Sequence, residues 1–237
     1  MPALLPADGR VVMISGASRG IGAAIADRLL TDGYSLSLGM RTPTPPTDPE
    51  RILTHRFDAL DPPTAGAWVE ATLQRFGRLD ALVNNAGIFR TVTFEEGSED
   101  DLDELWAVNV KGPFRLTRAA LPHLRAAANG RVVNICSTDG KRVRDRSASL
   151  GYVMSKHALV AMTHATRFAG WDDQLRATAL CPGAVETELV QNVPGAVPGP
   201  GRIEPETIAE TVSLLLSLPD NASVAELVVN TRLESML

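Results

Sequence analysis

The stretch that decides the fold is VVMISGASRGIG, residues 11–22. Its first four residues are apolar and predict a short buried strand. Glycines at positions 16, 20 and 22 predict a tight turn, and the spacing of Ile21, Ile25 and Leu29 predicts a helix after it. A helix that begins at such a turn directs its free N–H groups and its positive dipole end toward the turn, which suits a pyrophosphate. Glycines also occur in strand-to-helix turns that bind nothing, so this turn alone leaves both interpretations open.

The rest of the chain continues the alternation of strand and helix. Apolar runs predict strands over residues 35–39, 81–84, 131–135, 176–181 and 226–229, with another that ends near Asp58. Amphipathic patterns predict helices over residues 64–76, from Ser98, over 151–169 and after Pro205. Short apolar strands separated by such helices are typical of a parallel sheet covered on both faces. The sequence therefore predicts an α/β Rossmann fold with a doubly wound, mostly parallel sheet.

The two proline-dense segments, residues 42–49 and 194–205, are too short to separate domains and fit surface loops. We therefore expect a single domain over residues 1–237, with a cofactor half of about 1–135 and a catalytic and substrate half of about 136–237. Within it, Ser98-Glu99-Asp100-Asp101 resembles a capping box that opens a long helix. Pro113 is expected to kink or break that helix.

Composition excludes several other classes of protein. The chain has 28 acidic and 23 basic residues and a net charge of -5, which does not suggest a nucleic-acid binder. Its 44% hydrophobic and 22% charged residues are typical of a globular protein. No apolar run reaches the roughly 18 residues that span a bilayer, and the N-terminus lacks the pattern of a secretory signal. We therefore expect a cytoplasmic protein with no membrane or nucleic-acid partner.

Cysteine and histidine offer no metal or disulfide pattern. Cys136 and Cys181 each end an apolar, strand-like run, which favours buried packing over a disulfide or a thiolate metal site. The four histidines include no HExxH pair and no cluster with cysteine at metal-ligand spacing. We predict that the chain has no metal site.

Tyr152 and Lys156 stand four residues apart in a predicted helix, so both side chains project from one face. An ammonium near a phenol favours the phenolate, which makes the pair a candidate general acid and base near neutral pH. The same spacing also occurs on solvated helices. The pair alone therefore does not decide between a site and a surface.

Several motifs occur together in a familiar order along nearly the whole chain. They are Ser15 to Gly22, which resembles TGxxxGIG with Ser replacing the leading Thr, then Asn84-Asn85-Ala86-Gly87 (NNAG), Asn109 in Asn109-Val110-Lys111-Gly112, Ser137 at a strand end, Tyr152 to Lys156 (YxxxK) and Pro182-Gly183. With these motifs the sequence resembles the short-chain dehydrogenase/reductase family. The resemblance implies an NAD(P)-dependent oxidoreductase that interconverts a small-molecule alcohol and its carbonyl by hydride transfer.

The resemblance assigns roles to four catalytic residues. Tyr152 would give a proton to a carbonyl or take one from an alcohol, and Lys156 would lower the pKa of Tyr152 and bind the nicotinamide ribose. Ser137 would hydrogen-bond the substrate oxygen, and Asn109 would hold a water that links Lys156 to solvent. Two alternatives stay open: Ser137 as a strand-end serine that bonds the backbone, and Asn109 as a helix-kink residue that does the same.

The same resemblance, with the turn, predicts the residues that bind the cofactor. They are Gly16, Ser18, Arg19, Gly20, Ile21, Gly22, Arg41, Asp58, Asn85, Ala86, Gly87, Tyr152, Lys156, Pro182, Gly183, Val185 and Thr187. By resemblance Asp58 would hold the adenine amino group, the alternative being a turn former, and Thr187 would bind the nicotinamide carboxamide.

The residues after the second strand indicate which dinucleotide binds. Where an acid would accept from the ribose 2′-hydroxyl of NAD, the sequence has Met40, followed by Arg41. Arg41 and Arg19 are placed to donate charge-assisted hydrogen bonds to a 2′-phosphate. The sequence therefore predicts NADP (NADPH) in preference to NAD.

The loop between Ser137 and Tyr152 is longer than is usual in the family, and it carries Lys141, Arg142, Arg144 and Arg146. These cations could attract an anionic substrate, or they could form a solvated loop or subunit contact with Asp145 and its neighbours. Loops 87–97, 140–151 and 184–204 would build the substrate pocket, and a sequence does not give their shape.

Two further expectations concern the oligomeric state and the class of function. The family commonly forms homodimers or homotetramers by pairing helices that correspond to residues 100–127 and 151–169, although covering the sheet also explains their apolar positions. A non-catalytic dinucleotide-binding sensor or scaffold on the same fold is the alternative function. The presence of all four catalytic residues favours the enzyme, and the lack of a GxxxxGK[ST] motif argues against a P-loop nucleotidase.

Overall fold

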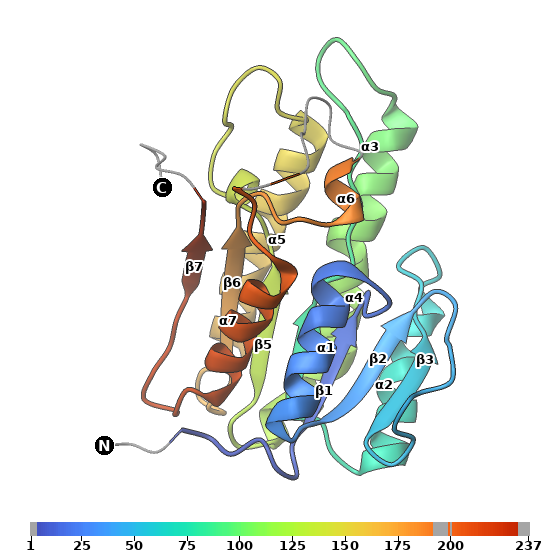
Figure 1. Cartoon of the computed structure of the whole chain (residues 1–237), viewed down its shortest axis with the longest axis vertical. Coiled ribbons are helices and arrows are strands. Elements are labelled where there is room, and N and C mark those ends of the chain that lie inside the picture. Colours follow the sequence, from blue (N-terminus) through green and yellow to red (C-terminus); the bar gives the residue numbers. More distant parts are fainter. Residues whose placement is uncertain (1–3, 192–198, 200, 232–237) are drawn as a thin grey trace.

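Seven parallel strands form one sheet in the order β3-β2-β1-β4-β5-β6-β7 (Figure 1). The computed structural model describes residues 4–191, 199 and 201–231. The strands are β1 (Val11–Ser15), β2 (Ser35–Met40), β3 (Ile52–Arg56), β4 (Ala81–Asn84), β5 (Arg131–Ile135), β6 (Arg176–Pro182) and β7 (Glu226–Val229). The chain order reverses between β1 and β4, which is where doubly wound sheets bind their ligands. The predicted Rossmann fold is confirmed.

Helices cover both faces of the sheet (Figure 1). Helices α1 (Gly20–Asp32) and α7 (Pro205–Ser217) pack on one face, and α2 (Pro63–Phe76), α4 (Gly112–Ala126) and α5 (Leu150–Gly170) pack on the other. A short helix, α6 (Glu188–Gln191), follows β6. All five residues of β1 are buried, and so are all residues of β4 and β5. Central strands that are buried on both faces consist of nearly continuous apolar residues. For this reason the sequence predicts their bounds closely.

The long helix predicted from Ser98 is interrupted by a wide turn. It consists of α3 (Glu99–Trp106), a π-helical segment η1 (Ala107–Lys111) and α4. The predicted capping box is present, with Asp101 N–H donating to Ser98 Oγ at 3.1 Å and Ser98 N–H donating to Asp101 Oδ2 at 3.1 Å. The interruption lies just before Pro113, which occupies the first turn of α4, because proline cannot donate the usual main-chain bond there.

Three further observations concern the state of the cysteines, metal-ligand clusters and helices that could span a membrane. Cys136 and Cys181 are both free and buried, as predicted. Among the residues that the structure describes, no cluster of three His, Cys, Asp or Glu side chains could hold a metal ion. None of the described helices is both long and apolar enough to cross a membrane.

Candidate functional site

The glycine turn between β1 and α1 adopts a backbone that needs its glycines. Gly16 and Gly20 have φ values of +68° and +54°, in the left-handed region that favours glycine. A Cβ on Gly16 would lie 2.9 Å from the Cα of Ala86, and one on Gly22 would lie 2.2 Å from the carbonyl oxygen of Gly16. The turn is therefore packed tightly on itself and on the segment after β4.

Asn85, which directly follows β4, holds this turn in place with two hydrogen bonds. Its Nδ2 donates to the main-chain oxygens of Ser15 at 3.0 Å and Gly16 at 3.1 Å. Arg19 occupies the N-cap of α1, and its side chain caps none of the free N–H groups there. Those N–H groups remain available to an anionic ligand, which fits the predicted pyrophosphate.

A cavity of about 1020 Å³ opens beside this turn at the carboxyl edge of the sheet. Nearly all the predicted site residues line it: Gly16, Ser18, Arg19, Gly20, Ile21, Arg41, Asp58, Asn85, Ala86, Gly87, Ser137, Tyr152, Lys156, Pro182, Gly183, Val185 and Thr187. Gly22 and Asn109 are absent from this lining. Gly22 instead supports the turn from behind, as the contact of its hypothetical Cβ shows.

Asp58 combines its two predicted alternatives. It lines the cavity, and its Oδ1 also accepts a hydrogen bond from the Leu60 N–H at 3.0 Å, as a turn former does. Its role toward adenine stays a prediction.

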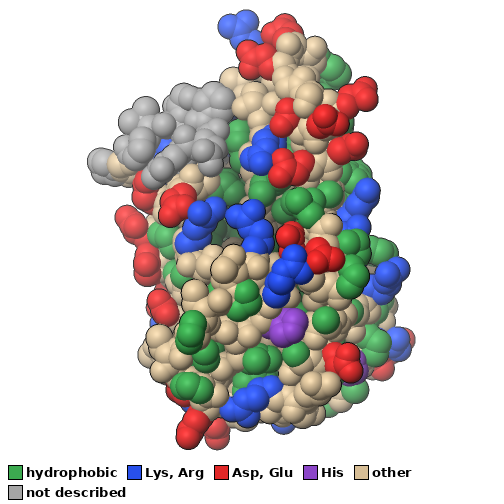
Figure 2. Space-filling view, turned by 90° about the vertical axis from the view of Figure 1, so that its right-hand side faces the viewer, with side chains coloured by type: hydrophobic (Ala, Val, Ile, Leu, Met, Phe, Trp, Pro, Cys, Tyr) green, Lys and Arg blue, Asp and Glu red, His purple; other side chains and the backbone are tan. Residues whose placement is uncertain are grey.

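Two arginines stand at the mouth of the cavity near the end of β2. Lys and Arg side chains gather around a hollow in the middle of the face shown in Figure 2. Arg19 Nη1 lies 2.7 Å from Glu188 Oε2, and both side chains are exposed. Arg41 is exposed, and the described part of the chain offers it no hydrogen bond or ion pair. Arg41 could therefore bind a 2′-phosphate directly, whereas Arg19 is already paired with Glu188.

Tyr152 and Ser137 meet on the opposite side of the cavity. Ser149 caps α5 by accepting from the Tyr152 N–H at 3.3 Å, and its hydroxyl donates to the carbonyl of Arg90 at 2.7 Å. This cap anchors the start of α5 on the loop after β4. The ring of Phe89 from that loop packs on Tyr152, with 5.2 Å between ring centroids, and Ser137 lines the same cavity.

Lys156 lies one helical turn after Tyr152 and is buried. Its Nζ donates to the main-chain oxygen of Ile135 at 3.0 Å and lies 5.6 Å from the centre of the Tyr152 ring. Burial lowers the pKa of Lys156 because it penalises the charged form.

Burial and nearby groups act on the pKa of Tyr152. Burial raises the pKa of Tyr152, the carboxylate of Asp139 raises it further, and the hydrogen bond with Ser137 only partly opposes them. The lowering of this pKa by Lys156 stays a prediction; its ammonium donates to the Ile135 carbonyl and lies 5.6 Å from the centre of the Tyr152 ring.

Asn109 lies in the π-helical segment and is buried. Its Oδ1 accepts from the Ile88 N–H at 2.9 Å, and its Nδ2 donates to the Ile88 carbonyl at 3.0 Å and to Ser155 Oγ at 3.1 Å. These bonds match the alternative in which Asn109 binds the backbone. A Cβ on Gly87 would lie 3.3 Å from Asn109 Oδ1 and 3.8 Å from Lys156 Nζ, so the two groups approach the same place. The proton relay stays a prediction.

Carboxylates pair with three cations of the basic loop, Lys141, Arg142 and Arg144. Lys141 bonds Glu226 on β7, whose other oxygen lies 2.7 Å from His164 Nε2. These contacts lower the pKa of Glu226, the lysine contributing most. Arg144 pairs with Asp145 at 2.8 Å, as the second alternative for this loop predicts.

Arg142 is the buried cation of this loop. Its Nη1 lies 2.9 Å from Asp139 Oδ1, and both residues line the cavity. Arg144 lines it too. Sequence reasoning missed Asp139, although its spacing of three residues from Arg142 is a signal that could have found it.

Asn230, at the end of β7, is a second residue that sequence reasoning missed. It lines the cavity, and its Nδ2 is buried with no hydrogen-bond partner among the residues that the structure describes. A Cβ on Gly183 would lie 2.4 Å from Asn230 Oδ1, so the amide packs on the Pro182-Gly183 motif.

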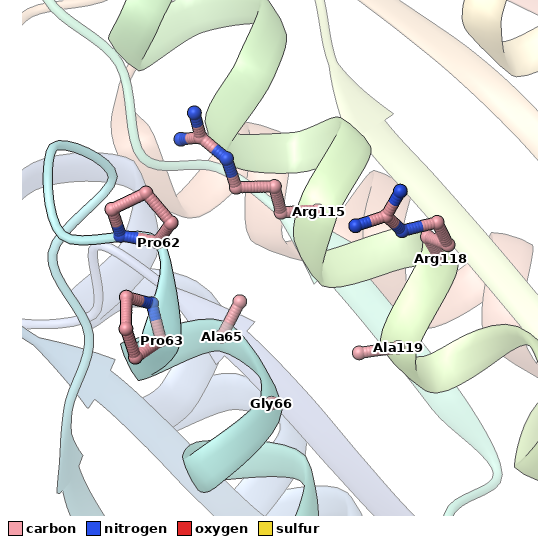
Figure 3. Close-up of a pocket in the computed structure, with 7 residues that line it drawn as sticks. All are labelled: Pro62, Pro63, Ala65, Gly66, Arg115, Arg118 and Ala119. Atoms are coloured by element: carbon pink, nitrogen blue, oxygen red, sulfur yellow. The ribbon is translucent and has the colours of Figure 1, made fainter.

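A second hollow, of about 350 Å³, lies between the start of α2 and α4 (Figure 3). It is lined by Pro62, Pro63, Ala65, Gly66, Arg115, Arg118 and Ala119, and none of the predicted site residues reaches it. Arg115 donates to the carbonyl of Ala59 at 2.9 Å, and Arg118 lies over the ring of Phe114 at 5.3 Å. The chemistry of the chain is concentrated in the larger cavity.

Comparison with known proteins now identifies the family. The family model described as short chain dehydrogenase matches residues 10–197. The chain belongs to the short-chain dehydrogenase/reductase family. An uncharacterized oxidoreductase of Staphylococcus saprophyticus is 30% identical over 242 residues, covering 96% of this chain and 98% of that protein. The alcohol dehydrogenase of the archaeon Thermococcus sibiricus, solved in complex with 5-hydroxy-NADP, is 32% identical with a TM-score of 0.82, covering 95% and 99% of the two chains.

Another relative in the short-chain dehydrogenase/reductase family is longer. The agropine synthesis reductase of Rhizobium rhizogenes is 40% identical over 220 residues, which cover 90% of this chain and 50% of that protein. The chain therefore spans about half the length of this relative. These three relatives are named as a reductase, an oxidoreductase and an alcohol dehydrogenase.

Proposed function

We propose that this enzyme interconverts an alcohol and its ketone or aldehyde, with NADP(H) as the hydride carrier. One observation carries the proposal: Tyr152, Ser137 and Lys156 line the same cavity as the glycine turn. A proton donor and a dinucleotide site that share one cavity are what reduction of a carbonyl requires. The sensor or scaffold alternative gives no reason for these three side chains to converge there.

In the proposed reaction the bound cofactor supplies or accepts the hydride. Tyr152 gives its phenolic proton to the carbonyl oxygen during reduction and takes a proton from the alcohol during oxidation. Ser137 hydrogen-bonds the same oxygen and so fixes its position and polarises the carbonyl. Lys156 binds the nicotinamide ribose. Phe89 packs against the Tyr152 ring in a tilted arrangement.

The preference for NADP rests on the end of β2. Arg41 follows that strand without a partner among the described residues, and no acid stands there to accept from a ribose 2′-hydroxyl. A guanidinium meets a 2′-phosphate with paired, charge-assisted hydrogen bonds. The relative from Thermococcus sibiricus, solved with 5-hydroxy-NADP, is consistent with this choice.

A panel of carbonyl compounds and alcohols tests this proposal, with turnover followed by absorbance of the reduced cofactor and with both dinucleotides. We expect carbonyl reduction with NADPH at rates above those with NADH. If tight NADPH binding occurred without turnover of any compound in the panel, the sensor alternative would be favoured. Equal rates with both dinucleotides would leave the reaction in place and remove the NADP preference.

We also propose that the enzyme self-associates through α4 and α5 as a homodimer or homotetramer. Apolar side chains are exposed along these helices: Phe114 on α4, Met154 and Phe168 on α5, and Trp171 directly after it. Exposed apolar groups that gather on one surface are typical of protein interfaces. Light scattering that gave 25.3 kDa, the mass of one chain, at micromolar concentration would contradict this. The cytoplasmic location stays a prediction from the sequence.

A further inference from the structure

The hydroxyl of Ser149 joins the start of α5 to the loop after β4. It accepts hydrogen bonds from the Tyr152 N–H at 3.3 Å and from the Val92 N–H at 3.1 Å. It donates to the Arg90 carbonyl at 2.7 Å, with a longer contact of 3.4 Å to the Val92 carbonyl. Ser149 is 4% exposed and lines the cavity. A hydroxyl has one hydrogen and two lone pairs, so these bonds use its full capacity.

A second contact holds the same two elements together at Gly151. The Gly151 N–H donates to the Val92 carbonyl at 3.1 Å. A Cβ on Gly151 would lie 2.9 Å from Val92 Cβ and 3.0 Å from Leu105 Cδ1, so the backbones approach too closely for a side chain. The loop is also anchored on α3, because Arg90 Nε donates to Glu104 Oε2 at 2.9 Å.

These contacts act directly on the residue that carries the phenol. Ser155 Oγ donates to the Tyr152 carbonyl at 2.8 Å, so both main-chain groups of Tyr152 bond serine hydroxyls, the N–H that of Ser149. The Phe89 ring, from the same loop, lies with its centroid 5.2 Å from that of Tyr152. The place of the Tyr152 ring relative to the loop therefore depends on the bonds that Ser149 makes to both.

We propose that Ser149 is a positioning residue that fixes the Tyr152 phenol against the loop after β4 and so aligns it with the substrate oxygen. The inference rests on the role proposed for Tyr152. Misplacing a reacting group by about 1 Å can cost about a hundredfold in rate. A serine that only capped α5 would have no need of the bond to the Arg90 carbonyl, because capping uses the lone pairs of the hydroxyl.

Replacement of Ser149 by aspartate separates positioning from capping. Aspartate caps a helix as well as serine does, and it can still accept from the Tyr152 and Val92 N–H groups. Its carboxylate has no hydrogen to donate, so in Ser149→Asp the bond to the Arg90 carbonyl is lost. We expect kcat for the best carbonyl of the panel to fall about tenfold or more, with an unchanged dissociation constant for NADPH. Ser149→Thr keeps the hydroxyl and should stay close to the parent in both.

Gly151→Ala disturbs the same contact without changing Ser149. Alanine is favoured over glycine within a helix, so an effect on helix stability alone would leave the enzyme as active as the parent. The added Cβ would push against Val92, and we therefore expect a loss of kcat with NADPH affinity retained. This variant also tests the proposal if Ser149→Asp does not fold.

Ser98→Ala is the matched control for the loss of a capping serine. Ser98 caps α3 by accepting from the Asp101 N–H at 3.1 Å, and it is not among the residues that line the cavity. Loss of this cap should lower the stability measured by urea unfolding, as loss of any such cap does. We expect kcat to stay at the parent value.

The tyrosines of the chain allow a readout that needs no substrate. The sequence has two, Tyr34 and Tyr152, so tyrosine labelled with carbon-13 in its ring gives NMR signals from two residues, and Tyr34→Phe assigns them. The Tyr152 signals should move in Ser149→Asp and in Gly151→Ala, because the ring shifts relative to Phe89. They should stay in place in Ser98→Ala.

Full turnover in Ser149→Asp, unmoved Tyr152 signals in that variant, or an equal loss of kcat in Ser98→Ala would overturn the proposal. A loss of NADPH affinity as large as the loss of kcat would overturn it too, because the defect would not be local. Such results leave the proposed function standing, since Tyr152 could donate a proton however it is held. Conversely, full turnover in Tyr152→Phe would reject the role of Tyr152, while the NMR signals would still show whether Ser149 holds its ring.

Discussion

Replacement of Arg41 by alanine should weaken the binding of NADPH and leave the binding of NADH nearly unchanged. Arg41 is exposed at the cavity mouth and has no partner among the described residues, so no internal bond is lost when it is removed. Arg19 stands on the same rim but is 2.7 Å from Glu188. A phosphate must compete with that carboxylate for Arg19, and for this reason Arg41 should contribute the larger share.

The expected size follows from the bonds that would be lost. A hydrogen bond to a charged group contributes roughly 1.5 to 3 kcal/mol. The dissociation constant for NADPH should therefore rise by about ten- to a hundredfold in Arg41→Ala. Titration calorimetry with each reduced dinucleotide measures both constants. Arg118→Ala, an exposed arginine on α4 outside the cavity, is the control and should change neither.

A complementary substitution changes Met40, the last residue of β2. Met40→Asp should repel the 2′-phosphate and offer the ribose hydroxyls of NADH an acceptor. Combined with Arg41→Ala it should reverse the preference. If Arg41→Ala weakened both dinucleotides equally, or if the unaltered enzyme bound them equally, Arg41 would not be the phosphate ligand and the reasoning would be refuted.

Three other predictions follow from contacts in and around the cavity. Lys156→Ala should weaken cofactor binding and lower turnover together, and a change confined to the pH profile would show that Lys156 does not bind the ribose. Gly22→Ala should reduce both stability and cofactor affinity, because its Cβ would lie 2.2 Å from the Gly16 carbonyl oxygen; urea unfolding with unchanged stability would contradict this. Glu226 has a lowered pKa in the folded chain, so its contribution to stability is present above the ordinary glutamate pKa and is lost as pH falls through the lowered value. Glu226→Gln should therefore lower the free energy of unfolding at neutral pH and approach the parent in acid, and a constant difference at all pH values would count against the ion pairs.

Local patterns in the sequence were enough to predict the strands and most helices. The strands over 81–84, 131–135 and 226–229 have the predicted bounds. The first two are buried along their whole length, and such strands appear in the sequence as short continuous apolar runs. The capping box at Ser98 was also predictable, since it is formed by residues three apart. The π-helical segment was not, because proline indicates an interruption near Pro113 but not whether the helix kinks, breaks or widens.

The candidate site was likewise predictable from the sequence in part. The cavity brings together all the predicted site residues except Gly22 and Asn109, whereas Asp139 and Asn230 were not predicted. The direction of the Lys156 ammonium was not predictable, because it depends on which carbonyl lies within reach, and that carbonyl belongs to Ile135 on β5. The contact of Phe89 with Tyr152 likewise depends on a loop whose path no local pattern specifies.

The central claim is that Tyr152 supplies the proton for reduction of a carbonyl in this cavity. The most direct test is the turnover of Tyr152→Phe measured together with its affinity for NADPH, since the substitution deletes the hydroxyl and little volume. We predict an unchanged dissociation constant for NADPH and the loss of nearly all turnover. Turnover within about tenfold of the parent would contradict the claim, because general acid catalysis contributes about a hundredfold or more.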